Sequence, residues 1–288
     1  MMWMNAYECR KILGDWALES LIREVELSPK PGLVDPEDTG SHADMNYELM
    51  IESAQSLRES FETIAEVSFN REPDQNLREE IAAIGREGEK HMLQTTNGVN
   101  THKGAIWVMG LLTSGAAINK PGEDIKTIVQ TASMLARFPD RYAPNTASHG
   151  SEIFKKYGVK GARGEATSGF PRLMNVALPQ LGKSRRRGLS EDVVLLNTLI
   201  SLMAHLEDTC IIHRSGLVVL HLVQNKANEI LDFGGVSTKE GWAKLKELNQ
   251  LLLDYQASPG GSADLLAAAI YMDRLHHLRK VERPLAAI

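Results

Sequence analysis

The sequence predicts an all-α protein folded as a single compact domain. Three observations favour this class. Apolar residues recur at helical spacing along most of the chain, alternating β-branched runs are almost absent, and no repeat, low-complexity tract or linker divides the 288 residues. Because 43% of the residues are hydrophobic, the chain can fill one large core. We therefore expect residues 1–288 to form one multi-helix domain, with glycine-rich charged loops forming an active site.

Helical spacing places the elements along the chain. Apolar residues at steps of three and four, together with one strongly apolar stretch, predict helices at residues 50–64, 77–92, 105–117, 125–135, 191–206, 217–231, 241–255 and 262–278. Ser237 and Glu240 have the spacing of a capping box for the penultimate helix, and Ser262 is in position to cap the last one.

Two polar segments are expected to be surface loops, residues 70–76 and 182–188. The second contains four cations, Lys183, Arg185, Arg186 and Arg187. These could contact a phosphate or RNA, but a run of charge is more often a solvated loop, which is the interpretation we favour.

Composition restricts the partners of the protein. Its 32 basic and 37 acidic residues give a net charge of −5, so the surface as a whole is not built to bind nucleic acid. Cys9 and Cys210 match no metal or disulfide pattern, which fits a reducing compartment. We find no signal peptide, and residues 105–117 are shorter than the roughly 20 needed to cross a bilayer. We expect a cytoplasmic protein with no membrane or nucleic-acid partner.

Glycine and charge gather in six segments, which we call the charged loops: residues 28–35, 41–45, 96–104, 158–166, 207–216 and 258–265. The loop at 96–104 is the most informative. It places His102 and Lys103 directly before the apolar helix, whose first N–H groups attract anions. Most of the other loops pair a cation with a carboxylate and small residues.

Each charged loop also has a purely structural explanation. Pro29 and Pro31 can end the first helix, Arg163 and Glu165 can form a weak exposed ion pair, and Asp264 suits the first turn of a helix. A helical bundle has little need of six such corners at once, however. We therefore predict that several of them form a binding site.

The residue types in these loops suit a phosphorylated substrate. Lys30, Lys103 and Arg163 can bind a polyphosphate, and glycines allow backbone N–H groups to approach its oxygens. Carboxylates can bind Mg²⁺ or transfer protons; they are Asp35, Asp44, Glu165 and Asp208. The chain has no P-loop, dinucleotide fingerprint, nucleophile elbow or zinc-protease motif. The residues alone therefore predict a helical enzyme acting on a phosphorylated or nucleotide substrate.

The charged loops resemble those of the triphosphoribosyl-dephospho-CoA synthase family over nearly the whole chain. Five motifs occur in the family order, at residues 27–35, 40–45, 98–104, 161–171 and 258–265. The sixth loop departs from the family pattern, because Cys210 and Ser215 stand where the family usually has Asn and Gly. Asp208 and Arg214 still match.

The resemblance implies a ribosyl transfer. The enzyme would join C1 of the ATP ribose to the 2′-hydroxyl of 3′-dephospho-CoA and release adenine, with Mg²⁺ expected as cofactor. The product would be the prosthetic-group precursor for citrate lyase or malonate decarboxylase, passed to a phosphoribosyl transferase that acts on an acyl carrier protein. Because the triphosphate is not cleaved, it would serve to orient the ribose. A homodimer is also compatible with the apolar helices.

Roles for individual residues follow as hypotheses. We expect the triphosphate and nucleoside to contact Lys30, Asn100, His102, Lys103, Gly104 and Arg163. Glu165, Asp35 and Asp44 are the candidates for acid–base catalysis or for binding the metal. The CoA portion would be bound, or the site braced, by Asp208, Arg214, Gly261, Ser262 and Asp264.

Two other functions stay open at this point. A non-catalytic nucleotide or CoA sensor could use the same loops without releasing adenine. A helical Mg²⁺-dependent phosphohydrolase could use His42 and Asp44 as metal ligands. It would release phosphate or pyrophosphate and leave adenine attached.

Overall fold

The computed structural model describes residues 3, 5–143 and 149–281, and within them it contains helices and no strand. The all-α prediction is confirmed. In chain order the helices are α1 (Ala6–Val25), α2 (Tyr47–Ser56), α3 (Arg58–Ser68), α4 (Gln75–Thr95), α5 (Lys103–Ile118), α6 (Ile125–Arg137), α7 (His149–Tyr157), α8 (Gly161–Thr167), the π-helical turn η1 (Leu173–Ala177), α9 (Leu178–Arg186), α10 (Glu191–His205), α11 (Thr209–Asp232), α12 (Lys239–Asp254) and α13 (Gly260–Val281).

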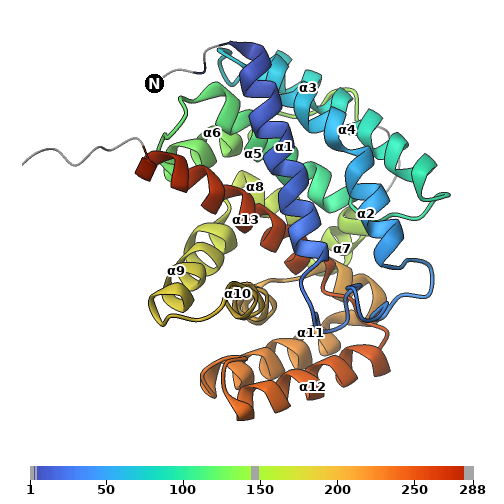
Figure 1. The fold of residues 1–288 in the computed structure, drawn as a ribbon. Helices are drawn as coiled ribbons and strands as arrows, with labels where there is room; N and C mark the ends of the chain where they lie inside the picture. The colour runs from blue at the N-terminus through green and yellow to red at the C-terminus, as the bar shows by residue number, and fades with distance from the viewer. Residues whose placement is uncertain (1–2, 4, 144–148, 282–288) are drawn as a thin grey trace, which may run out of the picture.

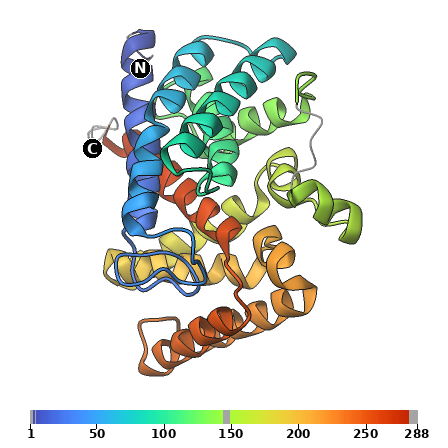
Figure 2. The same cartoon turned by 90° about the vertical axis from the view of Figure 1, so that its right-hand side faces the viewer.

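Two helices organise a single hydrophobic core. The apolar helix α5 is buried from Ala105 to Ala117 except at Trp107, which is partly buried, and it packs against α1, α3, α4, α6 and α13. Helix α13 crosses the middle of the molecule, with α1 to α6 on one side and α9 to α12 on the other (Figures 1 and 2). Near their N-terminal ends α5 and α13 come into contact, at Gly104 and Asp264.

The predicted helix at 50–64 is two helices, α2 and α3, separated at Leu57 (φ −90°, ψ −8°). Ala54 and Phe61, on either side of the break, are both buried in the same core. The apolar period continues across Leu57 because both helices face that core, so spacing alone did not reveal the break.

Three predictions about helix ends are wrong. The cap of α12 is Thr238, which accepts from the Gly241 N–H (3.0 Å), and not Ser237. Ser262 lies inside α13, which begins at Gly260. The expected loop 182–188 is mostly the end of α9, because its cations suit a helix C-terminus and the chain turns only at Gly188 (φ 71°).

Two of the charged loops are themselves largely helical. Residues 161–166 lie in α8, and most of 207–216 forms the first turns of α11, which is interrupted at Gly216 (φ 84°, ψ 174°). Among the described residues no single helix is long and apolar enough to cross a membrane; α10 and α11, bent by 58°, reach the required length and composition only as a pair.

Candidate functional site

The charged loops meet where α5, α11 and α13 begin. Asp208, the N-cap of α11, is buried and joins the start of α11 to the start of α13. Its carboxylate accepts from the Cys210 N–H (3.0 Å), the Gly261 N–H (3.3 Å), and both the N–H (2.8 Å) and the hydroxyl (2.9 Å) of Ser262. Asp208, Gly261 and Ser262, which were predicted to bind the substrate or brace the site, are thus in direct contact.

Asp264 joins α13 to the start of α5. Its carboxylate accepts from the Ala105 N–H and lies so close to Gly104 that a Cβ there would overlap Oδ2. Desolvation, with the negative charges of Asp208 and Glu24, raises the pKa of Asp264 well above its usual range. A carboxyl group that holds its proton in this way can act as a general acid.

Lys30 and His102 are buried beside this junction. Lys30 Nζ donates to Oε1 (2.6 Å) and to the carbonyl (2.8 Å) of Glu24, at the end of α1. His102 Nδ1 lies 2.8 Å from the Ser53 hydroxyl, and burial, together with the charge of Lys30, lowers the pKa of His102 to about 4. His102 is therefore neutral at pH 7, and neither side chain is an open cation as the sequence suggested.

Arg214 connects α11 to two further segments, the loop at residues 41–42 and the segment after α12. It donates to the carbonyls of Ser41 (2.9 Å) and Gln256 (3.4 Å) and to Nδ1 of His42 (3.1 Å). Because a guanidinium can only donate, Nδ1 is the acceptor, and Nε2–H of His42 donates to Ser258 Oγ (2.8 Å). Both ring nitrogens of His42 are occupied, so the arrangement does not favour His42 as a metal ligand.

A group of cations lies on the α4–α5–α8 side of the site. Arg78 is buried with its guanidinium 5.0 Å from the centre of the Trp107 ring, and its Nε has no hydrogen-bond partner among the described residues. Burial lowers the pKa of Arg78, and the nearby charge of Arg163 adds to this effect. Trp107 Nε1 donates to the carbonyl of Ala162 (3.3 Å), which fixes α8 against α5.

Lys103 and Asn100 flank this cation group at the start of α5. Lys103 is half exposed and pairs with Glu89 (2.5 Å). Asn100 is exposed, and its Oδ1 accepts from the Lys103 N–H (3.3 Å). Of the predicted phosphate ligands, Lys103 and Arg163 thus have exposed side chains, and the ion pair of Lys103 with Glu89 is itself solvent-accessible.

The three carboxylates predicted to be catalytic differ in their surroundings. Asp35 is buried and accepts from the N–H groups of Lys30 (2.7 Å), Glu37 (2.7 Å) and Asp38 (3.1 Å), so it shapes its loop. Asp44 is exposed, 3.7 Å from His42 Nδ1.

Glu165 differs from both. Its Oε1 accepts from the N–H groups of Arg172 (2.6 Å) and Leu173 (3.3 Å), and burial raises its pKa. Glu165 is thus a largely buried carboxyl group that is held by two backbone N–H groups and has a raised pKa.

The sequence matches the model of the CitG family, described as ATP:dephospho-CoA triphosphoribosyl transferase, over residues 10–283. The chain belongs to this family. It is 45% identical to the 2-(5′′-triphosphoribosyl)-3′-dephosphocoenzyme-A synthase of Klebsiella pneumoniae, over 91% of this chain and 94% of that protein. It is also 45% identical to probable synthases of the same name from Pseudomonas fluorescens Pf0-1 and Azotobacter vinelandii, again over 91% of this chain. No solved structure shows significant similarity.

As a member of this family the protein is a transferase, and two residues at its site depart from the family pattern noted above. Cys210 lies against Gly260: a Cβ added to this glycine would be 3.1 Å from the Sγ of Cys210. The Ser215 hydroxyl donates to the carbonyl of Tyr255 (2.9 Å). Cys210 therefore lies at the first residue of α13, and Ser215 joins α11 to the end of α12.

The described residues of the transferase contain no group of three or more His, Cys, Asp or Glu side chains that could hold a metal ion. Asp35, Asp44 and Glu165 do not form a shared ligand set, and Asp35 and Glu165 already accept backbone hydrogen bonds. Within the described part of the chain, these residues therefore do not form a ligand set that fits a resident Mg²⁺.

Sequence reasoning missed four residues of this site: Glu24, Ser53, Arg78 and Trp107. Ser53, Arg78 and Trp107 lie within predicted helices, and Glu24 lies near the end of α1. Only the tertiary contacts reveal that they face the charged loops.

Proposed function

We propose that this transferase joins the 5-triphosphoribosyl group of ATP to the 2′-hydroxyl of 3′-dephospho-CoA and releases adenine. The observation that carries the proposal is the junction of Asp208 and Asp264 with the starts of α5, α11 and α13, which gathers loops far apart in the sequence. The names of the relatives support the same substrates.

The reaction breaks the bond between adenine and C1 of the ribose and forms a bond between C1 and the acceptor oxygen. The acceptor hydroxyl loses one proton and the departing adenine gains one, so protons balance without a further reactant. Asp264 and Glu165, both with raised pKa values, suit the transfer of these protons. A carboxylate near C1 would also stabilise the positive charge that develops on the sugar.

We propose that the triphosphate lies over the open cations Lys103 and Arg163, with Arg78 behind them. Lys30 would act as a positioning residue, because its ammonium group already binds Glu24. His102 would be positioned by the contact of its Nδ1 with Ser53, while its buried Nε2 has no partner among the described residues. Binding the phosphates without cleaving them would use their binding energy to orient the ribose. Mg²⁺, if required, would arrive on the triphosphate and need few protein ligands.

The proposal is tested by incubating the protein with ATP, Mg²⁺ and dephospho-CoA and identifying the products by mass spectrometry. Free adenine with a triphosphoribosyl adduct of dephospho-CoA is the expected result. Adenine should not appear without the acceptor if displacement is direct. Release of ADP, phosphate or pyrophosphate would instead indicate a phosphohydrolase, and unchanged ATP a sensor.

We further propose that the product is the prosthetic-group precursor for citrate lyase or malonate decarboxylase. Supplying the purified product, with a phosphoribosyl transferase, to the apo acyl carrier protein of each enzyme would identify the acceptor. Location in the cytoplasm and a homodimer remain predictions; light scattering of the purified protein tests the dimer.

A further inference from the structure

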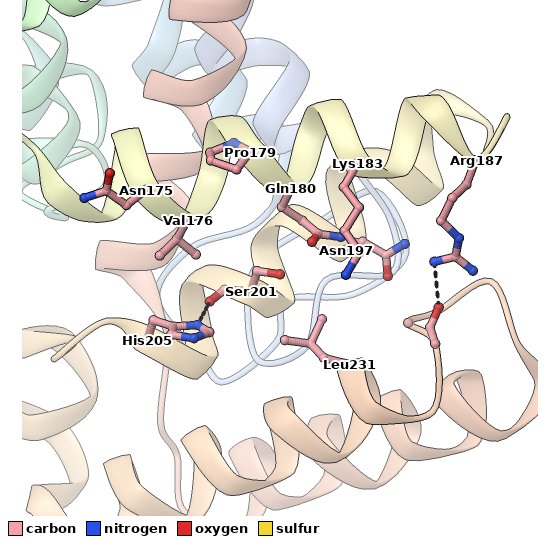
Figure 3. Close-up of a pocket in the computed structure, with 12 residues that line it drawn as sticks. Asn175, Val176, Pro179, Gln180, Lys183, Arg187, Asn197, Ser201, His205 and Leu231 are labelled. Carbon is pink, nitrogen blue, oxygen red and sulfur yellow. Dashed lines mark hydrogen bonds between the residues drawn. The ribbon is translucent and has the colours of Figure 1, made fainter.

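A cavity of about 340 Å³ lies away from the charged-loop site, between η1 and α9 on one side and α10 and the turn after α11 on the other (Figure 3). None of the site residues predicted from the sequence lines it. Its volume falls in the range of small-molecule pockets, about 300–1,000 Å³.

The lining of this cavity is basic and rich in amides. Lys183 extends from α9 toward it, and Arg187, the residue after α9, lies at its edge and donates to the carbonyl of Gly234 (3.2 Å). No acidic side chain is among the residues that line it. Lys183 makes no ion pair or hydrogen bond within the described part of the chain. Arg185, from the same basic segment, is instead engaged by Asp273 (2.8 Å) and Glu191 (2.6 Å). In this basic segment Arg185 therefore forms ion pairs within the protein, whereas Lys183 and Arg187 line the cavity.

Asn197 supplies an unused donor at the cavity wall. Its side chain is 1% exposed, and its Oδ1 accepts from the Val236 N–H (2.9 Å). This contact orients the amide, because Gly235 (φ 83°) lies so close to Oδ1 that any side chain there would overlap it. Nδ2 then has no partner among the described residues. An unpaired buried amide is costly, so the donor fits a site that a ligand oxygen completes.

We propose that this cavity binds a phosphorylated small molecule, with phosphate oxygens accepting from Asn197 Nδ2 and pairing with Lys183 and Arg187. Two cations and a fixed amide donor suit a phosphate ester or diphosphate better than a neutral ligand. The phosphate could belong to a substrate of the proposed reaction or to a separate effector, and kinetics separates these two sources.

The test is calorimetric titration of the full-length protein with inorganic pyrophosphate. The double variant Lys183→Gln/Arg187→Gln should weaken binding at one site by about tenfold or more, because it removes two charge-assisted contacts. Arg186→Gln is the matched control, because Arg186 is exposed on the same helix but does not line the cavity. Binding that is unchanged in the double variant, or equally weakened in the control, would overturn the proposal.

Asn197→Asp provides a second test, because it keeps Oδ1 for Val236 and replaces the free donor with an oxygen. It should weaken pyrophosphate binding by a similar factor, with folding checked by circular dichroism. If Asn197→Asp does not fold, the proposal is tested by the double variant Lys183→Gln/Arg187→Gln alone, because both of those residues are exposed. A raised KM for dephospho-CoA in the double variant would assign the site to that substrate, and an unchanged KM to an effector. Neither result depends on Lys103 or Asp264, so failure here leaves the proposed reaction testable.

Discussion

The carboxylate of Asp264 occupies the space in which a side chain on residue 104 would lie. Glycine at position 104 therefore leaves room for a contact between α5 and α13, two helices far apart in the sequence, and a side chain there would have to displace the Asp264 carboxylate. The same contact places a carboxyl group of raised pKa at the start of α5. This relationship links the most informative loop of the sequence to the centre of the proposed site.

Gly104→Ala should displace the Asp264 carboxylate and lower kcat by about tenfold or more, since a small misplacement of a reacting group is costly. Steady-state kinetics with ATP and dephospho-CoA measures the effect. Gly85→Ala is the control, because an added Cβ there meets only Ile106, at 3.6 Å. The control should keep full activity and, as a helical glycine, gain about 0.5–1 kcal/mol of stability. Equal activity in both variants would separate Gly104 from the reaction.

Loss of the Asp208 carboxylate should strongly destabilise the fold. Asp208→Ala leaves three backbone N–H groups and one hydroxyl near α13 without their acceptor, so we expect a loss of about 3 kcal/mol in the free energy of unfolding. Ser262→Ala removes only one of these bonds and should cost about 1 kcal/mol. Urea denaturation compares the two variants, and similar losses would contradict the bracing role of Asp208.

The buried His102 should make stability depend on pH. Its folded pKa of about 4 lies below the unfolded value of 6.5, so its neutral form stabilises the fold fully above pH 6.5. This contribution, about 3 kcal/mol, is lost as the pH falls from 6.5 toward 4.

Urea denaturation of the wild type and of His102→Asn at pH 7.5 and pH 5 isolates this effect from carboxyl titration. The difference in stability between the two proteins should shrink toward pH 5. A difference that does not change with pH would show that His102 is not the titrating group.

Lys103→Ala should raise the KM for ATP by about tenfold, because it removes one charge-assisted contact to the triphosphate. Lys90→Ala is the matched control, since Lys90 is an exposed lysine on the neighbouring helix that pairs with Glu87. The KM for dephospho-CoA should stay unchanged in both variants. If Lys103→Ala and Lys90→Ala have the same KM for ATP, the triphosphate does not bind at the start of α5.

Glu165→Gln should lower kcat by roughly 100-fold while the protein stays folded. The amide oxygen of glutamine can still accept from the N–H groups of Arg172 and Leu173, which hold this corner together. Kinetics and thermal unfolding together test the prediction. Glu191→Gln, at a surface carboxylate paired with Arg185, is the control. Near-normal turnover in Glu165→Gln would exclude Glu165 as the acid–base group.

Much of this site was predictable from residue types. Asp208, Gly261, Ser262 and Asp264 were predicted together as site residues, because glycine and charge gather in their loops. In the structure these residues do lie close together. The roles of Lys30 and His102 were not predictable. Their partners, Glu24 and Ser53, lie on helices whose polar residues follow no distinctive pattern.

The sequence by itself determined the all-α class, the family and the loops that form the site, because apolar spacing and glycine–charge motifs are local signals. Only the tertiary structure decided which ionisable groups remain open to a ligand. Burial and pairing make His102 neutral and engage Lys30 with Glu24, while Lys103 and Arg163 stay at the surface. The basic segment of α9 shows the same division, since packing assigns Arg185 to ion pairs and Lys183 and Arg187 to a cavity. Desolvation and partner geometry depend on residues distant in sequence, and no local pattern contains them.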